Sequence, residues 1–247
     1  IVYCFGEERH PVTAADCASF LTAQNGLPVQ DEKGSFVLDE EAVTAYVQSL
    51  AEEYDGYGRT RQFHSTRGDV LTIEGGTYGS KMDRKKETAY LLEHLLDPGV
   101  HTGTPQTHVP SYEREAFCYG KNDIGDTYIE VDMTEQKMYY YEKGVLKLET
   151  EIVTGNMRRR MGTPEGVNFV YNKQKNRVLR GPGYASPVKF WMPVKGGIGI
   201  HDAGWRKEFG GDIYQTAGSH GCINTPKDKM EELFDCVQIG TPVVMFY

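Results

Sequence analysis

This sequence lacks any apolar run near the length needed to cross a bilayer, which is about 20 residues. It also lacks a strongly basic region: its formal net charge is −8, and its basic runs, Arg84-Lys85-Lys86 and Arg158-Arg159-Arg160, are short. We expect both runs to be solvated and expect no nucleic-acid partner, because such binding needs a basic footprint. No secretion signal is visible, and the chain begins at Ile1 rather than Met. The simplest interpretation is an excised fragment, so contact with a membrane would need a segment missing from this chain.

Cysteine is scarce and irregularly spaced. The five cysteines are an odd number, so at least one thiol stays unpaired within the chain, and 247 residues are too many to need a disulfide framework. A bridge between Cys4 and Cys17 stays open as an alternative. For Cys4, Cys17, Cys118 and Cys236 we expect inert packing, whereas Cys222 lies among polar residues.

The first part of the chain predicts a mixture of helices and strands. Thr13 and Asp16 have the spacing of a capping box, so a short helix is expected after Thr13. Asp39 is expected to cap a longer helix over 40–54, whose apolar residues recur at helical spacing. The other expected features are a strand near Val70 and Thr72, a break at Glu74-Gly75-Gly76, and a helix over 84–96 that ends at Asp97-Pro98-Gly99.

A change of composition separates this part from the rest. Residues 101–111 combine Gly, Pro and Thr with little apolar content, which is typical of a linker. We therefore place the domain boundary between about 98 and 124. The expected organisation is an α+β accessory domain over 1–110, followed by a mostly-β domain over 122–247.

The second part reads mainly as strands. Ile129 and Val131 alternate with polar neighbours, which predicts a strand buried on one face only. A hairpin is expected to turn at Lys143-Gly144, and Thr225 with Pro226 is expected to begin the one clear helix. The expected strands cover 127–132, 137–142, 145–153, 166–171, 188–192, 197–201 and 242–247.

The hexapeptide Ser219-His220-Gly221-Cys222-Ile223-Asn224 is an unusual setting for a buried structural thiol. The thiolate is the reactive form of cysteine, and a nearby imidazolium or helix start lowers the pKa of the thiol. Cys222 is therefore predicted to be a nucleophile just upstream of a helix. The Gly221 and Cys222 N–H groups are expected to stabilise an oxyanion. Ser219 and Asn224 are expected to hold the loop by hydrogen bonds to its own backbone.

A nucleophilic cysteine needs a general base, and His201 is the better candidate. It ends the glycine-rich apolar run 196–200, a plausible strand, and Asp202 follows it. Either the carboxylate or the backbone carbonyl of Asp202 would fix the tautomer of the imidazole. His220 is nearly adjacent to the cysteine, but neighbours on an extended chain point to opposite sides. Loop orientation, substrate binding and proton transfer all stay open for His220.

Two sequence blocks together carry a family resemblance. Ile200-His201-Asp202-Ala203 and the hexapeptide at 219–224 resemble the signature of the L,D-transpeptidase catalytic domain, the YkuD-type domain. Supporting pieces are Val153-Thr154-Gly155-Asn156, Thr163-Pro164-Glu165-Gly166 and Trp191-Met192-Pro193. The resemblance covers about 122–247.

The resemblance implies both a fold and a chemistry. The implied fold is a YkuD-like β-sandwich with one or two helices, in which Cys222 attacks, His201 is the base and His220 helps to shape the site. The implied activity is 3→3 cross-linking of peptidoglycan through a cysteine thioester, with release of the terminal D-alanine of a tetrapeptide stem. Stem peptides would be donor and acceptor, no cofactor would be needed, and carbapenems would inhibit. The implied location is extracytoplasmic, at the cell wall or in a membrane-anchored ectodomain.

The first part resembles the accessory domain that precedes this catalytic domain in some Gram-positive members, a family named for peptidoglycan binding. Residues 54–61 and 75–79 carry this resemblance. Three alternatives stay open: an L,D-carboxypeptidase that releases D-alanine to water, a non-catalytic wall-binding protein, and a zinc site. His201, His220 and Cys222 would be legitimate zinc ligands, but a fourth ligand is not obvious.

Overall fold

The computed structural model describes residues 1–97, 104–181 and 183–247. The expected helix end at Pro98-Gly99 and the start of the expected linker, 101–103, lie outside the described residues. The chain forms two compact units, which we call the first and the second unit. The first comprises Ile1–Tyr57 and Gly79–Asp123, and the second comprises Gly58–Tyr78 and Ile124–Tyr247. The expected order, an α+β part followed by a mostly-β part, is confirmed.

The first helices begin where their capping residues predict. α1 (Ala14–Ser19) follows a capping box in which Asp16 N donates to Thr13 Oγ1 and Thr13 N donates to Asp16 Oδ2. α2 (Glu40–Tyr54) follows Asp39, whose carboxylate accepts hydrogen bonds from two N–H groups of the first turn. Each cap satisfies backbone donors that the helix itself leaves unpaired.

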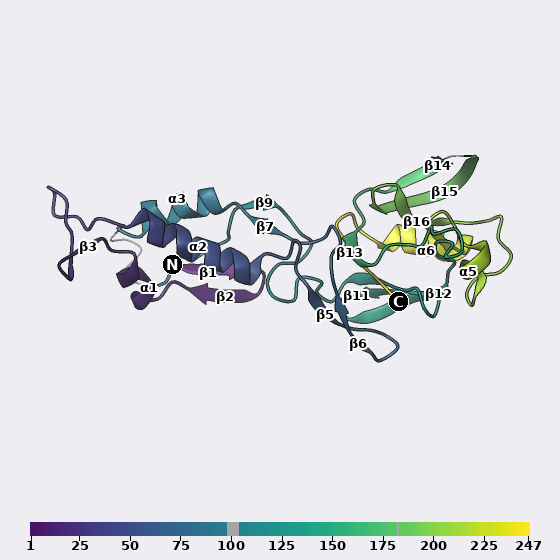
Figure 1. Ribbon diagram of the computed structural model, residues 1–247, viewed down its shortest axis with the longest axis horizontal. Coiled ribbons are helices and arrows are strands. Elements are labelled where there is room, and N and C mark those ends of the chain that lie inside the picture. The colour runs from purple at the N-terminus through teal and green to yellow at the C-terminus, as the bar shows by residue number, and fades with distance from the viewer. Residues whose placement is uncertain (98–103, 182) are drawn as a thin grey trace. The chain divides into compact units, whose positions relative to one another are not determined.

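In the first unit, α2 and α3 (Arg84–His94) lie side by side and pack on a small sheet (Figure 1). The sheet contains, in order, β2 (Glu8–Pro11), β1 (Val2–Phe5) and β8 (Thr107–His108). Two short ladders pair β3 (Ala23–Gln24) with β4 (Leu27–Pro28), and β7 (Lys81–Met82) with β9 (Tyr112–Arg114). The core between helices and sheet contains Tyr3, Phe5, Val43, Val47, Leu50 and Leu91. Among the described residues, no helix combines the length and apolar character of a membrane span.

The second unit is built from two sheets. The five-stranded sheet has the order β12 (Val145–Glu151), β11 (Lys137–Glu142), β10 (Tyr128–Asp132), β18 (Pro242–Phe246) and β13 (Gly166–Phe169). The four-stranded sheet has the order β14 (Gln174–Gly181), β15 (Tyr184–Lys195), β16 (Ile198–Asp202) and β17 (Ile223–Thr225). Side chains of both sheets and of α6 (Lys227–Cys236) share one core, as in a sandwich.

A hairpin from the early part of the sequence belongs to the second unit. β5 (Arg61–His64) and β6 (Val70–Ile73) pair antiparallel, and Gly76 forms a bridge with Val167 of β13. The sequence boundary would place all of 58–78 in the first domain. Backbone pairing across about ninety residues of chain overrides that division, and composition carries no signal for such long-range pairing.

The expectation that β10 is buried on one face only is wrong. Its polar residues Glu130 and Asp132 are 0 % and 1 % exposed. Thr66, in the turn of the β5–β6 hairpin, donates from N to Glu130 Oε1 (2.9 Å) and from Oγ1 to Glu130 Oε2 (2.7 Å). Arg67 Nη1 donates to Asp132 Oδ1 (3.0 Å) and Oδ2 (3.2 Å). The hairpin therefore covers the polar face, which alternation alone assigns to solvent.

Several elements differ from the sequence expectations in the second unit. β5, β14, β17 and the short α5 (Ile213–Ala217) were not expected, and β15 is longer than predicted. Thr225 is not the cap of α6, because it pairs in β17 and its buried hydroxyl has no hydrogen-bond partner among the described residues. Pro226 takes the cap position without a side-chain hydrogen bond. Strand pairing with β16 holds Thr225 extended, so the helix begins two residues after it.

Candidate active site

The hexapeptide forms a tight loop that leads into β17. Gly221 has φ +116°, a conformation that favours glycine. Ser219 Oγ accepts from Gly221 N (3.0 Å) and donates to Cys222 O (2.6 Å), so Ser219 holds the loop through its own backbone as predicted. The Gly221 N–H is therefore already used within the loop. Of the two N–H groups expected to stabilise an oxyanion, the Cys222 N–H remains. The three residues of β17 stand between Cys222 and the start of α6, so the helix does not follow the sulfur directly.

The segment 153–163 supports this loop from outside. Thr163 Oγ1 donates to Gly221 O (2.7 Å) and accepts from Gly155 N (3.0 Å). Ser219 N donates to Thr154 O (2.9 Å). Thr163 is 3 % exposed, and its hydroxyl satisfies a carbonyl and an N–H that burial would otherwise leave unpaired. Its contact with Gly221 therefore joins this segment directly to the hexapeptide loop.

His201 lies at the end of β16 with its ring almost fully buried, at 4 % exposed. Its Nδ1 donates to Asp202 O (2.8 Å), and its Nε2 accepts from Asn224 Nδ2 (3.1 Å). The backbone carbonyl of Asp202 therefore selects the tautomer, and the Asp202 carboxylate instead accepts from Phe190 N (2.7 Å). The lone pair that could accept a proton is on Nε2.

The prediction that the Asn224 side chain holds the loop backbone is wrong. The parallel register of β16 and β17 places Asn224 opposite His201, and the amide contacts the imidazole. Its Oδ1 accepts from Arg206 Nε (2.7 Å). Sequence reasoning missed Arg206, which lies in no motif and follows a turn after β16 in which Arg206 N donates to Ala203 O (2.9 Å).

Two cavities meet at the half-buried Cys222. The smaller has a volume of about 180 Å³ and the larger about 700 Å³. The Cys222 thiol donates to Gly197 O (3.7 Å), beside the larger cavity. The smaller cavity is lined by Leu179, Ser186, His201, Trp205, Arg206, Gly218, Ser219, His220, Cys222 and Asn224. The larger cavity is lined by residues that include Tyr171, Asn172, Arg177, Leu179, Trp191 and Gly197.

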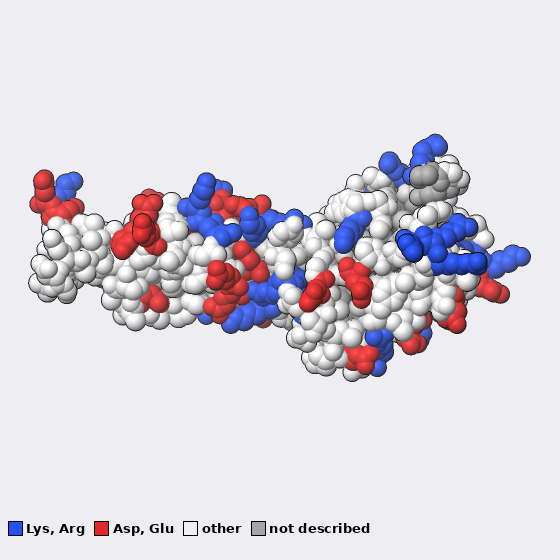
Figure 2. Space-filling model, in the orientation of Figure 1, with Lys and Arg blue, Asp and Glu red and all other residues white. Residues whose placement is uncertain are grey.

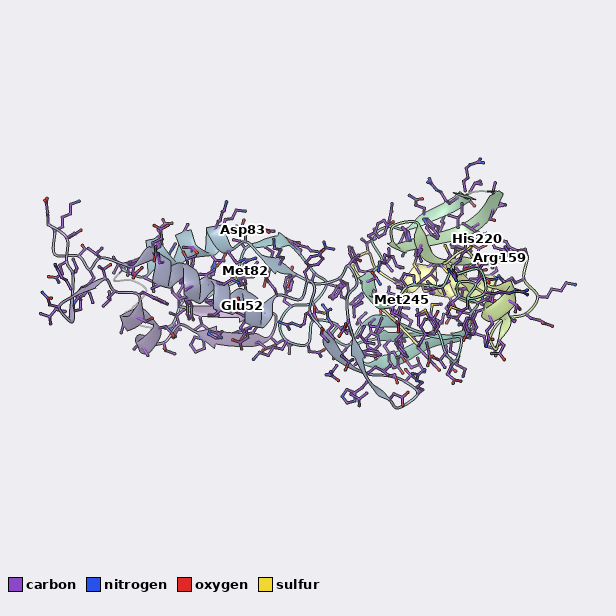
Figure 3. The ribbon with its side chains drawn as sticks, viewed as in Figure 1. Glu52, Met82, Asp83, Arg159, His220 and Met245 are labelled. Carbon is purple, nitrogen blue, oxygen red and sulfur yellow. The ribbon has the colours of Figure 1, made fainter. Side chains whose placement is uncertain are left out.

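The site therefore brings together Cys222, His201 and His220, the three residues that the resemblance places at the centre. His220 is exposed and lies at the smaller cavity; Figure 3 labels it on the second unit. The rings of Trp191 and Trp205 each have their centroid 5.9 Å from that of His201. In the described part of the chain, no three His, Cys, Asp or Glu side chains are grouped as metal ligands would be. All five cysteines are unpaired, so Cys4 and Cys17 form no bridge.

Burial decides the protonation of the Cys222–His201 pair. It raises the pKa of the Cys222 thiol, against a smaller lowering effect of a backbone hydrogen bond with Gly199. Burial also lowers the pKa of His201, and the charge of Arg206 lowers it further, whereas Asp202 raises it. Both shifts favour a neutral thiol beside a neutral imidazole. The low thiol pKa expected from the sequence is therefore wrong, because desolvation outweighs the stabilising contacts.

Exposed arginines lie next to the hexapeptide loop. Arg158, Arg159 and Arg160 are all exposed, as expected. Arg158 N donates to Gln215 O (3.0 Å), and Arg159 N donates to Asn156 Oδ1 (2.9 Å). Figure 2 shows Lys and Arg side chains gathered on this part of the second unit, where Figure 3 labels Arg159.

Comparisons with known proteins identify the class. Residues 126–245 match the family model of the L,D-transpeptidase catalytic domain, and residues 21–99 match a family named for peptidoglycan binding. A crystal structure of Enterococcus faecium L,D-transpeptidase, with one cysteine replaced by serine, is 37% identical with a TM-score of 0.83. That alignment covers 99% of this chain and 94% of that one. An Ldtfm–avibactam carbamoyl enzyme is 38% identical with a TM-score of 0.84, covering 100% of this chain and 92% of that one.

The fold and these matches define a protein with an L,D-transpeptidase catalytic domain. The chain belongs to the L,D-transpeptidase family. The comparison with curated proteins gave no match. The YkuD-like fold and the accessory domain, both expected from the sequence, are confirmed.

Proposed function

We propose that this chain forms 3→3 peptidoglycan cross-links, with Cys222 as nucleophile and His201 as general base. The observation that carries the proposal is the position of one sulfur at two cavities. A transferase must bring a donor and an acceptor to the same atom in turn. Two cavities that are both lined by Cys222 meet this requirement. The half-buried Cys222 and the buried imidazole of His201 line the smaller cavity together.

In the first step, the Cys222 sulfur attacks the carbonyl of residue three of a tetrapeptide stem. His201 Nε2 takes the thiol proton, because Nδ1–H is committed to the Asp202 carbonyl. The Asn224 N–H must give way to the thiol at this lone pair. A C–S bond forms, the C–N bond to residue four breaks, and the leaving amine takes the proton from His201. The Cys222 N–H is the loop donor that supports the oxyanion.

In the second step, the side-chain amine of residue three on an acceptor stem attacks the thioester. An N–C bond forms, the C–S bond breaks, and the amine proton returns to Cys222 through His201. Water in place of the amine would give hydrolysis, which is the carboxypeptidase alternative. The larger cavity, with a volume in the range of ~300–1,000 Å³ that accommodates drug-sized ligands, supports the binding of a peptide.

The proposal extends to partners and location. We expect peptidoglycan stem peptides as substrates and an extracytoplasmic location, where that substrate is found. The match of residues 21–99 supports wall binding by the first unit. The structure of Ldtfm as an avibactam carbamoyl enzyme supports acylation of this chain by β-lactam-like inhibitors, and we expect carbapenems to acylate Cys222.

The test is the product profile of purified protein on defined muropeptides, read by mass spectrometry. Cys222→Ala should abolish both the thioester mass and the cross-linked dimer while the fold is kept, because the variant lacks the sulfur that forms the C–S bond in the proposed mechanism. Cys236→Ala is the matched control, since Cys236 is an exposed cysteine on α6 and should leave activity unchanged.

Three results would count against this proposal. Cross-linking by the Cys222→Ala protein would exclude Cys222 as nucleophile. Release of D-alanine without dimers would indicate the carboxypeptidase. Retention on sacculi by wild type and Cys222→Ala alike, with Cys222 unreactive towards carbapenems, would indicate a non-catalytic wall-binding protein.

A further inference from the structure

Arg206 is a charged group at the smaller cavity that the proposed mechanism does not use. Its side chain is half-buried and lines that cavity together with His201 and Cys222. Nε donates to Asn224 Oδ1 (2.7 Å), and Nη2 donates to Ala217 O (2.9 Å). Two neutral acceptors therefore hold the guanidinium in one orientation beside the catalytic pair.

The positive charge of Arg206 has no acidic partner among the residues that the structure describes. Burial lowers the pKa of its guanidinium, and no neighbouring carboxylate offsets that effect. The Asp202 carboxylate, at the end of the neighbouring strand, accepts from Phe190 N instead. The charge acts on His201, whose pKa it lowers. A half-buried cation without a counter-charge is stabilised by an anion that enters the cavity.

The N–H donors of Arg206 that make no hydrogen bond in this structure are suited to binding a carboxylate. Arginine carries five N–H donors in a planar arrangement, and the two hydrogen bonds use Nε and one hydrogen of Nη2. One Nη2 hydrogen and both Nη1 hydrogens remain. Donors on both Nη atoms suit the two oxygens of a carboxylate, which arginine binds through parallel N–H···O bonds.

We propose that Arg206 binds a carboxylate of the donor stem, and specifically the terminal carboxylate of the residue that leaves. The inference rests on the proposed function, because it needs the carbonyl of residue three at Cys222. The terminal carboxylate belongs to the amino acid directly after that carbonyl, so it must lie within one residue of the sulfur. Arg206 and Cys222 line the same small cavity.

The cavity volumes support this division of the substrate. About 180 Å³ is below the ~300–1,000 Å³ of pockets for drug-sized ligands, so the smaller cavity suits one small residue. The larger cavity, about 700 Å³, has room for the remaining stem. The same chemistry could come from the α-carboxylate of residue two in a stem whose residue two is joined to residue three through its side chain. The substrates below distinguish the two sources.

The experiment uses the full chain and three synthetic tetrapeptides: the free acid, its C-terminal carboxamide, and the α-carboxamide of residue two. The measured quantity is kcat/KM for release of residue four. The C-terminal carboxamide should lower the wild-type value roughly ten- to hundredfold. Arg206→Gln should lower it similarly on the free acid. The two losses should not add, because they remove the same interaction. The Arg206→Gln protein should therefore have equal kcat/KM values for the free acid and the C-terminal carboxamide.

Lys147→Gln is the matched control. Lys147 is an exposed cation on β12 and is not among the residues that line either cavity, so this variant should keep the full preference for the free acid. Arg206→Lys, which keeps the charge without the planar fork, should keep part of the preference and replaces the Gln variant if that does not fold. The assignment is overturned if Arg206→Gln keeps the wild-type preference. It is also overturned if Arg206→Gln lowers kcat/KM equally for all three substrates. The same holds if the variant loses its preference for the free carboxylate at residue two and not at the C-terminus.

Equilibrium binding separates this inference from the proposed function. In Cys222→Ala protein, the free acid should bind more tightly than the C-terminal carboxamide, and adding Arg206→Gln should remove the difference. If this binding difference is found but the wild-type protein forms no thioester, the cross-linking proposal is wrong and the carboxylate site at Arg206 is supported. Equal affinities in Cys222→Ala protein, with an active wild type, would overturn the Arg206 assignment alone.

Discussion

At the residue scale, Cys222 and His201 are held as neutral partners. Burial raises the pKa of the thiol and lowers the pKa of the imidazole. A preformed thiolate–imidazolium pair would need the opposite shifts. We therefore expect the proton to leave the sulfur as the carbonyl is attacked, rather than before. The Asp202 carbonyl supports this order, because it fixes Nδ1–H and leaves Nε2 as the proton acceptor.

The pKa of His201 predicts the acid limb of the pH profile. The base must be neutral to act, and the pKa of His201 lies below the usual ~6.5. As the pH falls, the rate should therefore begin to decrease only below about that pH. Arg206→Gln removes a positive charge, raises the pKa of His201 and should move the limb to higher pH; Asp202, which raises that pKa, is unchanged. The measurement is the rate of carbapenem acylation of Cys222 against pH. A limb above pH ~6.5 in wild type would contradict the prediction.

A surface cation provides the control for this pH experiment. Lys229 lies on α6 and forms an exposed ion pair with Glu232. Lys229→Gln removes one positive charge, as Arg206→Gln does, but solvent and salt screen an exposed charge strongly. Its acid limb should coincide with that of wild type, and an equal shift in both variants would point to net charge rather than to the local field of Arg206.

At the element scale, the β5–β6 hairpin completes the burial of β10. Glu130 is buried, which raises the pKa of its carboxyl group, and its hydrogen bonds with Thr66 lower that pKa. Arg67 forms an ion pair with Asp132 and donates from Nη2 to Tyr247 O (3.2 Å). A strand with two buried carboxyl groups needs these partners, because an unpaired buried polar group is costly.

Thr66→Ala should lower the free energy of unfolding by about 1–3 kcal/mol, because Glu130 Oε2 loses the hydroxyl that satisfies it. Chemical denaturation of the full chain, followed by tryptophan fluorescence, measures the change. Thr72→Ala is the matched control: Thr72 is an exposed residue of the same hairpin, and its hydroxyl accepts from the exposed side chain of Gln62 through Nε2. The control should stay within about 0.5 kcal/mol of wild type. Equal effects of the two variants would argue against a role for the Thr66–Glu130 contact.

At the scale of the whole molecule, the chain enters the second unit twice. Residues 58–78 join it, the chain returns to the first unit over 79–123, and the rest of the second unit follows. The residues that line both cavities all come from the last segment, 124–247. The first unit carries a clear excess of acidic residues, whereas the second is nearly balanced. The acidic balance of the chain therefore belongs to the first unit and not to the site.

A fragment of residues 124–247 should melt at a lower temperature than the full chain but should still be acylated by a carbapenem. The fragment keeps the cavities but leaves Glu130 and Asp132 without Thr66 and Arg67. Both tryptophans lie in the second unit, so their fluorescence reports its melting, and intact mass reports the adduct. Glu130→Gln with Asp132→Asn should recover part of the lost stability in the fragment. An unchanged melting temperature, or no adduct, would contradict the prediction.

Much of the fold was predictable where the signal is local. Asp39 caps α2 because its carboxylate reaches N–H groups two and three residues on. The hairpin of β11 and β12 turns at Lys143-Gly144, where both residues have positive φ. β14 carried no such signal, because its largely exposed residues show no apolar alternation.

The sequence by itself determined the family and the central residues, because Cys222, His201 and His220 lie in two short blocks whose residue types are unusual together. Only the tertiary structure decided the state of those residues. Burial shifted the pKa values of Cys222 and His201, and strand register placed Asn224 against His201. A chain segment without any motif brought Arg206 to the cavity. The reason is physical: local hydrogen bonds and spacing are written along the chain, whereas desolvation and long-range contacts exist only after distant segments pack together.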